Sequence, residues 1–287
     1  MNEHVFDQTG TKIRGFFGMF DILGYRDFIK QNTLDKTIDI FKRLKVDLDR
    51  QAVTLAGQDT RQLTALTPTK SLVFSDTIVL YQALSRSMTD FAPTFLTKAC
   101  VLLRLAFERG LPLRGAISFG EFFVHERAFL GMPIIDAYEA ERTQQWSGVA
   151  LTLSAQREYE AYETRRQSAR NVTYRGITSN SADSFAPFSP DIVVDTDIPI
   201  KSESKTRKGY SLRWDDFIVD YARLESIKDL NTFLSRQSIE ERVEESFSAH
   251  GKQINGEDVR EKIERTVGFL VEMRDRPLKN VRLTYVA

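Results

Sequence analysis

The chain has 287 residues with 41% hydrophobic content, which is enough for one sizeable core and a small appendage. Forty Lys and Arg residues balance forty Asp and Glu residues, so no overall positive charge attracts DNA or RNA, and nucleic acid is not expected as a partner. The one cysteine, Cys100, excludes an internal disulfide and is expected to be a small core residue.

The most apolar segment, "FLTKACVLLRLAF", is interrupted by Lys98 and Arg104 and is too short to span a membrane. The start of the chain, "MNEHVFDQTG", lacks the shape of a signal peptide. We therefore expect a cytoplasmic protein with no membrane partner.

The first half of the chain alternates between strand-like and helix-like patterns. We expect a strand near 13–20, one long helix near 24–52, a hairpin "KSLVFSDTIVLY" with Asp76 at its tip, a helix near 89–109 that ends at Gly110, and a strand "LPLRGAISFGEFFVH". This order of strand, helix, hairpin, helix and strand predicts a ferredoxin-like α+β sheet with helices on one face.

The second half should add a short helix from Pro133 to about Gln145, the strand "GVALTLS" and a charged helix that starts near Ser154. Residues 165–190 are polar and indicate a loop, and 191–215 indicate a second hairpin. The sequence beyond it is helical and highly charged. We therefore predict a main domain over 1–215 and a helical C-terminal extension over 216–287.

Two acids lie where this fold would bring them together. Asp21 ends the first strand and Asp76 occupies the hairpin tip beside it. Converging carboxylates repel each other unless a cation lies between them, and Mg²⁺ accepts such oxygen ligands together with water and substrate phosphates. Gly24 would let a phosphate approach the backbone closely. On the residues alone, a helix cap for Asp21 and ordinary turn chemistry for Asp76 stay open.

The segments "FFGMFDILGYRDF" and "LVFSDTIVLY" resemble the class III nucleotidyl cyclases. Their first metal motif is phenylalanine, any residue, Asp-Ile, any residue, glycine and an aromatic, and a second acid follows at the next hairpin tip. The resemblance continues through "LRGAISFGEFF" and "FLGMPIIDAYEAE" and covers roughly 14–160. It implies a class III cyclase catalytic fold, a homodimer with active sites at the interface, two Mg²⁺ or Mn²⁺ ions per site held by Asp21, Ile22 and Asp76, and nucleotide contacts from Leu23, Gly24 and Tyr25.

Two positions depart from the purine cyclases. That group carries a lysine four residues before the second acid and a polar residue three before the glycine matched by Gly131, where this chain has Leu72 and Ala128. A base pocket without these partners would lose selectivity for purines. The pattern is similar to the pyrimidine cyclases of bacterial Pycsar antiphage systems, whose cyclic UMP or cyclic CMP activates a separate effector. The resemblance thus implies UTP or CTP as substrate, while a purine cyclase with a relocated base contact stays open.

Three basic residues lie in segments that could contribute to the site. The transition-state arginine of the family would fall at Ala140, and the nearest arginine, Arg142, requires a shifted register; a solvated helix arginine is the alternative. Lys201 could match a phosphate-binding lysine of the late hairpin, or be a plain charge at its tip. Arg114 opens a strand and is interpreted as a salt-bridge residue at the rim. Because the family's asparagine–arginine pair is missing, a cyclase-like module that only senses a nucleotide is the rival function.

Overall fold

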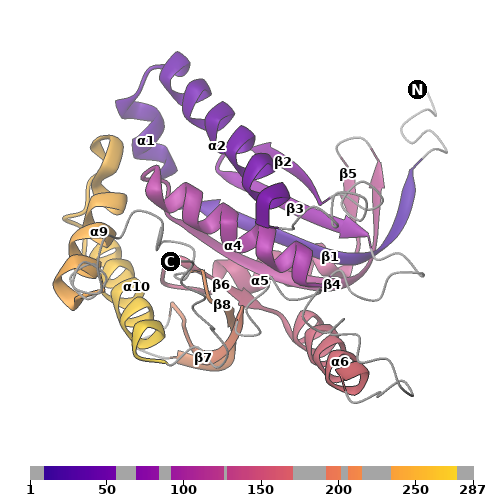
Figure 1. The fold of residues 1–287 in the computed structure, drawn as a ribbon. Coiled ribbons are helices and arrows are strands. Elements are labelled where there is room, and N and C mark those ends of the chain that lie inside the picture. The colour runs from indigo at the N-terminus through magenta and orange to yellow at the C-terminus, as the bar shows by residue number, and fades with distance from the viewer. Residues whose placement is uncertain are drawn as a thin grey trace, which may run out of the picture.

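The computed structural model describes residues 10–55, 69–83, 92–125, 128–170, 192–201, 206–214 and 234–276. These residues form one mixed sheet in the order β2-β3-β1-β4-β6-β8-β7, with β5 paired to the end of β4 (Figure 1). The strands are β1 (Thr11–Ile22), β2 (Lys70–Phe74), β3 (Thr77–Ala83), β4 (Leu113–His125), β5 (Ala128–Leu130), β6 (Gly148–Leu151), β7 (Val193–Pro199) and β8 (Thr206–Leu212). The helices are α1 (Tyr25–Gln31), α2 (Leu34–Leu55), α4 (Ala92–Glu108), α5 (Met132–Arg142), α6 (Leu153–Arg170), α9 (Arg236–Ser248) and α10 (Glu257–Asp275), with a short 3₁₀ turn, η3 (Ala249–Gly251).

The first four strands confirm the predicted ferredoxin-like topology. Strand β1 pairs antiparallel with β3 on one side and with β4 on the other, and β2 lies outside β3. Strand β6 then extends the sheet parallel to β4, and the predicted late hairpin is present as β7 and β8. The fold is therefore α+β, with an antiparallel-rich sheet and a helical C-terminal part.

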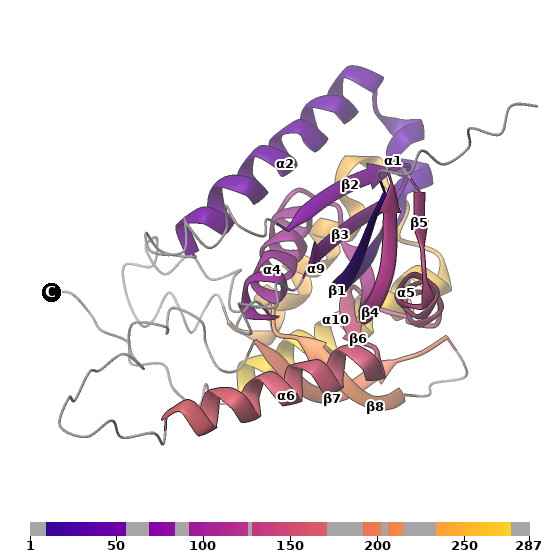
Figure 2. The same ribbon diagram turned by 90° about the vertical axis from the view of Figure 1, so that its right-hand side faces the viewer.

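Alternation along β1 divides its side chains between two faces of the sheet. Phe16 faces α4, where its ring stacks on Phe95 at 5.4 Å. Phe17 faces the opposite way and meets Phe122 edge-on at 5.7 Å in a smaller cluster that includes Ala137 of α5. The helices of the first half lie on one face, as expected, and α5 covers the other (Figure 2).

The expected single helix over 24–52 is wrong, because the chain breaks into α1 and α2. Asn32 ends α1 in an extended conformation, and its side-chain amide donates to the carbonyls of Phe28 at 2.7 Å and of His250 at 3.1 Å. Thr33 begins α2, where its hydroxyl accepts from the Lys36 N–H at 3.3 Å. Short polar side chains offer the backbone alternatives to the helix ladder, which is why the break lies here.

Other boundaries differ from expectation by less. Strand β1 is longer at both ends than 13–20, and α6 continues to Arg170, into the stretch expected to be a loop. Residues 171–191 and the predicted domain boundary at 215 and 216 lie outside the described residues.

Helix α4 carries the most apolar segment of the chain and is buried. Cys100 is fully buried in it, as predicted. Lys98 lies at its edge, where the ammonium contacts Asp49 at 3.1 Å and the Thr69 carbonyl at 3.1 Å. No described helix is both long and apolar enough to cross a lipid bilayer.

The C-terminal helices share the core of the sheet. Phe269 of α10 packs edge-on against Trp146 at 4.7 Å, and both side chains are buried. The Arg213 guanidinium donates to the Met273 carbonyl at 2.7 Å, and the Ser246 hydroxyl of α9 donates to a carbonyl of α4 at 2.8 Å. The described C-terminal helices therefore belong to the same hydrophobic cluster as β1 and α4.

We expect Phe269→Ala to lower the free energy of unfolding by about 3–5 kcal/mol, because it removes a buried ring and leaves a cavity against Trp146. Glu264→Ala, on the exposed side of the same helix, should change it by less than about 0.5 kcal/mol. Denaturant unfolding of both variants measures the difference. Equal stabilities would contradict the shared core.

Candidate active site

The structure brings Asp21 and Asp76 together at the same end of the neighbouring strands β1 and β3. Asp21 is opposite Thr77 in the β1–β3 register, and Asp76 lies in the tight turn just before Thr77. The Ile22 N–H donates to the Asp76 carbonyl at 2.9 Å, which fixes the turn against the end of β1. The negative charge of Asp76 contributes to a raised pKa of Asp21, so the two carboxylates lie within electrostatic reach of each other.

The Asp21 carboxylate lies on the α5 face of the sheet, where its side chain is 26% exposed. Burial raises the pKa of this group from 3.8 to about 6. The positive charge of Arg114 opposes that rise, and its Nη2 atom lies 3.1 Å from Oδ2 of Asp21. Desolvation therefore changes the pKa of Asp21 more than the ion pair with Arg114 does.

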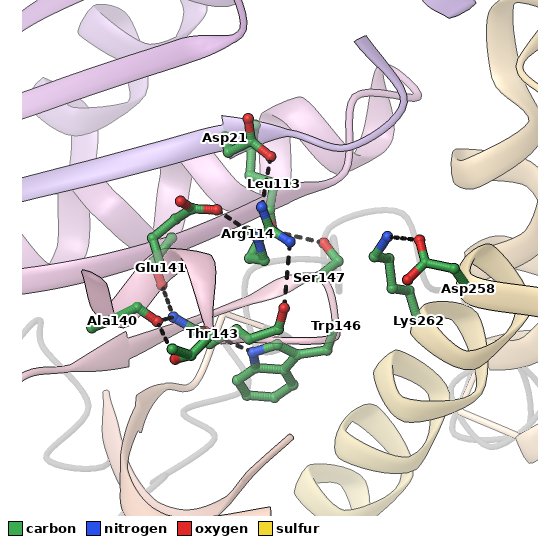
Figure 3. Close-up of polar contacts among 12 residues, drawn as sticks. Asp21, Leu113, Arg114, Ala140, Glu141, Thr143, Trp146, Ser147, Asp258 and Lys262 are labelled. Carbon is green, nitrogen blue, oxygen red and sulfur yellow. Dashed lines mark hydrogen bonds and ion pairs between the residues drawn. The ribbon is translucent and has the colours of Figure 1, made fainter. Parts of the chain in front are cut away.

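Arg114 is a buried residue and not the rim residue expected from the sequence. Only 8% of it is exposed. It is opposite Asp21 in the β1–β4 register, and besides Asp21 it contacts Glu141 of α5, with Nε donating to Oε1 at 2.5 Å. Nη1 also donates to the Gln144 carbonyl at 3.3 Å. Figure 3 shows the guanidinium between the two carboxylates, so it links the sheet to α5.

Glu141 is the site residue that the sequence analysis missed. The buried residues of α5 are Pro133, Ala137 and Glu141, spaced four apart along one face of the helix. A carboxylate that continues such a stripe must meet a cation in the folded protein, and that spacing was the available signal.

Arg142 lies on the exposed side of α5, away from the acids of its own chain. Its Nη1 donates to the Tyr138 hydroxyl at 2.8 Å, and its guanidinium carbon lies 5.1 Å from the centre of that ring. The structure therefore does not bring Arg142 to Asp21 within one chain. Its predicted role stays a prediction.

Lys201 reaches the site from the tip of the late hairpin. Its N–H donates to the Thr143 carbonyl at 2.7 Å, which ties the hairpin to the end of α5. Burial lowers the pKa of Lys201, and the charge of Arg114 lowers it further. The charge of Lys201 in turn lowers the pKa of Asp21. Within the described part of the chain, no acidic side chain forms an ion pair with Lys201.

The residues around Gly24 are accounted for by the fold. Gly24 has a φ of 75°, and a side chain there would meet the Lys252 stem at 2.9 Å. The Leu23 side chain is buried and its N–H donates to the Pro112 carbonyl at 2.9 Å, while Tyr25 packs against the core. A glycine is therefore required here whether or not a phosphate approaches.

The two predicted base-contacting residues lie in different parts of the sheet. Leu72 is opposite Val79 and packs against the smaller cluster on the face that carries Asp21. Ala128 is opposite His125, at the end of β4 far from Arg114. The structure brings Leu72, but not Ala128, to the strand ends where the acids lie.

The acids suit an open magnesium or manganese site. The described residues include no group of three or more His, Cys, Asp or Glu side chains able to enclose a metal ion. Two neighbouring carboxylates nevertheless match the needs of Mg²⁺, which keeps several waters and is completed by substrate phosphates. The donor set therefore fits the expected ions.

Comparisons with known proteins give structural likenesses only. No protein-family model and no curated protein matches this chain. One similar solved structure is the adenylyl cyclase CyaB from P. aeruginosa, with 11% identity, TM-score 0.44, and coverage of 71% of this chain and 95% of that chain. Another is the catalytic core of a rhodopsin-guanylyl cyclase with converted specificity in complex with ATPαS. It has 9% identity and a TM-score of 0.46, and the match covers 72% of this chain and 99% of that chain. A third is the guanylate cyclase domain of RhGC from Catenaria anguillulae in complex with GTP. It has 9% identity and a TM-score of 0.45, and the match covers 70% of this chain and 97% of that chain.

We expect Asp21→Asn to stabilise the metal-free protein at pH 7.5 by on the order of 1–3 kcal/mol. Folding raises the pKa of Asp21, so the folded state disfavours the carboxylate that is present above pH 6. The gain should grow between about pH 4 and pH 6 and vanish below pH 4. Thermal unfolding in EDTA across this range measures it, with Glu264→Gln as an exposed control. A loss of stability at pH 7.5 would show that the Arg114 ion pair dominates instead.

Proposed function

We propose that this protein is a nucleotidyl cyclase that converts UTP or CTP into the 3′,5′-cyclic monophosphate and pyrophosphate. The observation that carries the proposal is the charge arrangement at the end of β1, where Asp21 and Asp76 lie beside Arg114 and Lys201. Paired carboxylates suit divalent ions, and the adjacent cations suit the phosphates of a nucleotide. The motif resemblance around Asp21 and Asp76 supports the same reaction.

Two Mg²⁺ or Mn²⁺ ions would be held by Asp21, Asp76 and the backbone of Ile22. When bound, such ions lower the pKa of an attacking hydroxyl and neutralise the charge of a leaving pyrophosphate. For this, Asp21 must be ionised and must release Arg114. Because Arg114 keeps its contact with Glu141, it stays anchored after that release.

Arg114 and Lys201 would bind the triphosphate. The positive charge of Arg114 lowers the pKa of Lys201, and an anion between the two cations would relieve their repulsion. The reaction forms a bond from the 3′-oxygen to the α-phosphorus, releases the proton of the 3′-hydroxyl to water, and breaks the bond from that phosphorus to pyrophosphate. The positive charges would stabilise the charge that develops on the leaving group.

The proposed choice of a pyrimidine base depends on Leu72, because Ala128 lies at the far end of β4 from Arg114. Leu72 is partly exposed on the face that carries Asp21, and its side chain offers no hydrogen bond to a purine edge. Buried polar edges without partners cost about 1–3 kcal/mol each, so a purine would be disfavoured. By the same resemblance, we propose that the cyclic product is read by a separate effector protein in antiphage defence.

We further propose a homodimer with shared sites. Helix α5 exposes Met132, Ile135 and Tyr138, and Phe74 at the end of β2 is 77% exposed. Apolar side chains gathered around one face favour burial against a partner. Arg142 lies next to Tyr138 on α5 and would then reach the acids of the other subunit.

A nucleotide-sensing module is the second candidate, and one observation favours it. Arg114 already neutralises Asp21 without a metal, and the family's arginine position is Ala140. A module of this kind would bind a nucleotide through Arg114 and Lys201 without cyclising it.

We expect Mn²⁺-dependent release of pyrophosphate from UTP or CTP, much faster than from ATP or GTP, because the Leu72 side chain offers no hydrogen bond to a purine. Incubation with each nucleoside triphosphate, followed by mass identification of the products, measures this. Asp21→Ala or Asp76→Ala should lower the rate about 100-fold or more, since each removes a metal ligand. Asp35→Ala, on the exposed first turn of α2, is the matched control. Binding without any cyclic product would favour the sensing module, and preferential formation of cyclic AMP or cyclic GMP would refute the base choice.

We expect inactive Asp76→Ala and inactive Arg142→Ala proteins to rescue each other when they are refolded together. Half of randomly paired dimers are mixed, and each mixed dimer regains one complete site, so activity should approach about a quarter of wild type. Turnover after co-refolding, with mixed dimers verified by mass, measures this. Full activity of Arg142→Ala alone would remove Arg142 from the site, and a dead mixture of verified mixed dimers would exclude shared sites.

A further inference from the structure

Helix α10 of the C-terminal part is attached to the segments that carry the site. The Thr266 hydroxyl accepts from the Ser147 N–H at 2.9 Å, just before β6. The Arg265 guanidinium donates to the Ile200 carbonyl at 3.0 Å, directly before Lys201. Arg265 therefore holds the hairpin tip in the position from which the charge of Lys201 acts on Asp21.

A second contact between α10 and the segments of the site lies one to two turns earlier in the helix. The Gln145 side-chain amide donates to Asp258 at 2.6 Å and to Glu261 at 3.2 Å. Gln145 is buried and lies three residues after the end of α5. The first turns of α10 thus lie beside the end of α5 and the tip of the late hairpin.

Lys262 lies on the side of α10 that faces the site. Its side chain is only 14% exposed and forms an ion pair with Asp258. Figure 3 shows this pair opposite Ser147 and Arg114. The charge of Lys262 lowers the pKa of Lys201, so the two ammonium groups lie within electrostatic reach of each other.

We propose that Lys262 is a phosphate-binding residue of the candidate site, which makes α10 a constituent of that site. This inference rests on the proposed function, because it assigns Lys262 to the triphosphate of the same nucleotide. Asp258 is the partner of Lys262 in the apo protein and gives it up to a phosphate oxygen. Asp258 is more exposed than Lys262, so its carboxylate can turn to water after that exchange.

The charges explain why a polyanion suits this place. Three cations, Arg114 of β4, Lys201 of the hairpin tip and Lys262 of α10, belong to neighbouring segments, and the charges of Arg114 and Lys262 both lower the pKa of Lys201. Arg114 and Lys262 have carboxylate partners, whereas Lys201 forms no ion pair within the described residues. Repulsion among the three groups is relieved when several phosphate oxygens lie between them.

The test uses Mg²⁺ with inorganic tripolyphosphate, which probes phosphate binding without turnover. We expect Lys262→Gln to weaken binding about 10-fold or more, as measured by titration calorimetry, because a charge-assisted hydrogen bond is lost. Lys262→Arg should bind within about threefold of wild type, since it keeps the charge. Arg260→Gln, on the exposed side of α10, is the matched control and should bind within about twofold.

Asp258→Asn separates a ligand role from a structural one. If Lys262 binds phosphate, loss of its resting partner should leave tripolyphosphate affinity unchanged or increase it severalfold. If the pair only holds α10 in place, both Asp258→Asn and Lys262→Gln should weaken binding and lower the melting temperature together. That second pattern, or wild-type affinity in Lys262→Gln, would overturn the proposal.

The outcome is distinguishable from that of the proposed function. If the variants bind tripolyphosphate as expected while wild type cyclises no nucleotide, the phosphate site stands and the cyclase assignment fails. If wild type cyclises UTP or CTP and Lys262→Gln binds tripolyphosphate normally, the cyclase stands and the role of Lys262 fails.

Discussion

The interaction on which the site depends is the buried guanidinium of Arg114 between Asp21 and Glu141. A buried charge is tolerated only when it is paired and hydrogen-bonded, and Arg114 meets both conditions through two carboxylates and a carbonyl. These contacts join β1, β4 and α5. They therefore determine where α5 lies on the sheet, and with it the segment at its end that contacts the late hairpin.

The two faces of β1 differ: one packs into the large hydrophobic cluster, and the other carries the candidate site. The face with Phe16 contributes to the large cluster that also contains the C-terminal helices. The face with Phe17 and Asp21 has a smaller cluster, and its polar groups gather at the strand ends. Because the large cluster stabilises the fold, the other face can hold a half-buried acid whose pKa is raised to about 6.

Asp21 and Lys262 each have a charged partner, Arg114 and Asp258, so the proposed binding of a ligand would be an exchange of partners. In this proposal Asp21 would release Arg114, and Lys262 would release Asp258, while Arg114 would keep Glu141. An exchange costs less than exposing a bare charge in a buried place, because one partner remains. The C-terminal helix α10 takes part in this network and also packs against Trp146, so the same helix serves both the core and the site.

Local patterns in the sequence determined the order of elements, the ferredoxin-like sheet, and the positions of Asp21 and Asp76 at a strand end and a turn, because periodicity and turn chemistry act over a few residues. The break at Asn32 escaped prediction, since that side chain also contacts His250, far along the chain. Only the tertiary structure decided that Arg114 is buried, that Glu141 rather than Arg142 contacts it, and that Lys201 and α10 lie at the same site. These outcomes depend on pairing between distant segments. The spacing along α5 signals that Glu141 is buried, but the identity of its cationic partner is set by packing and leaves no local signal.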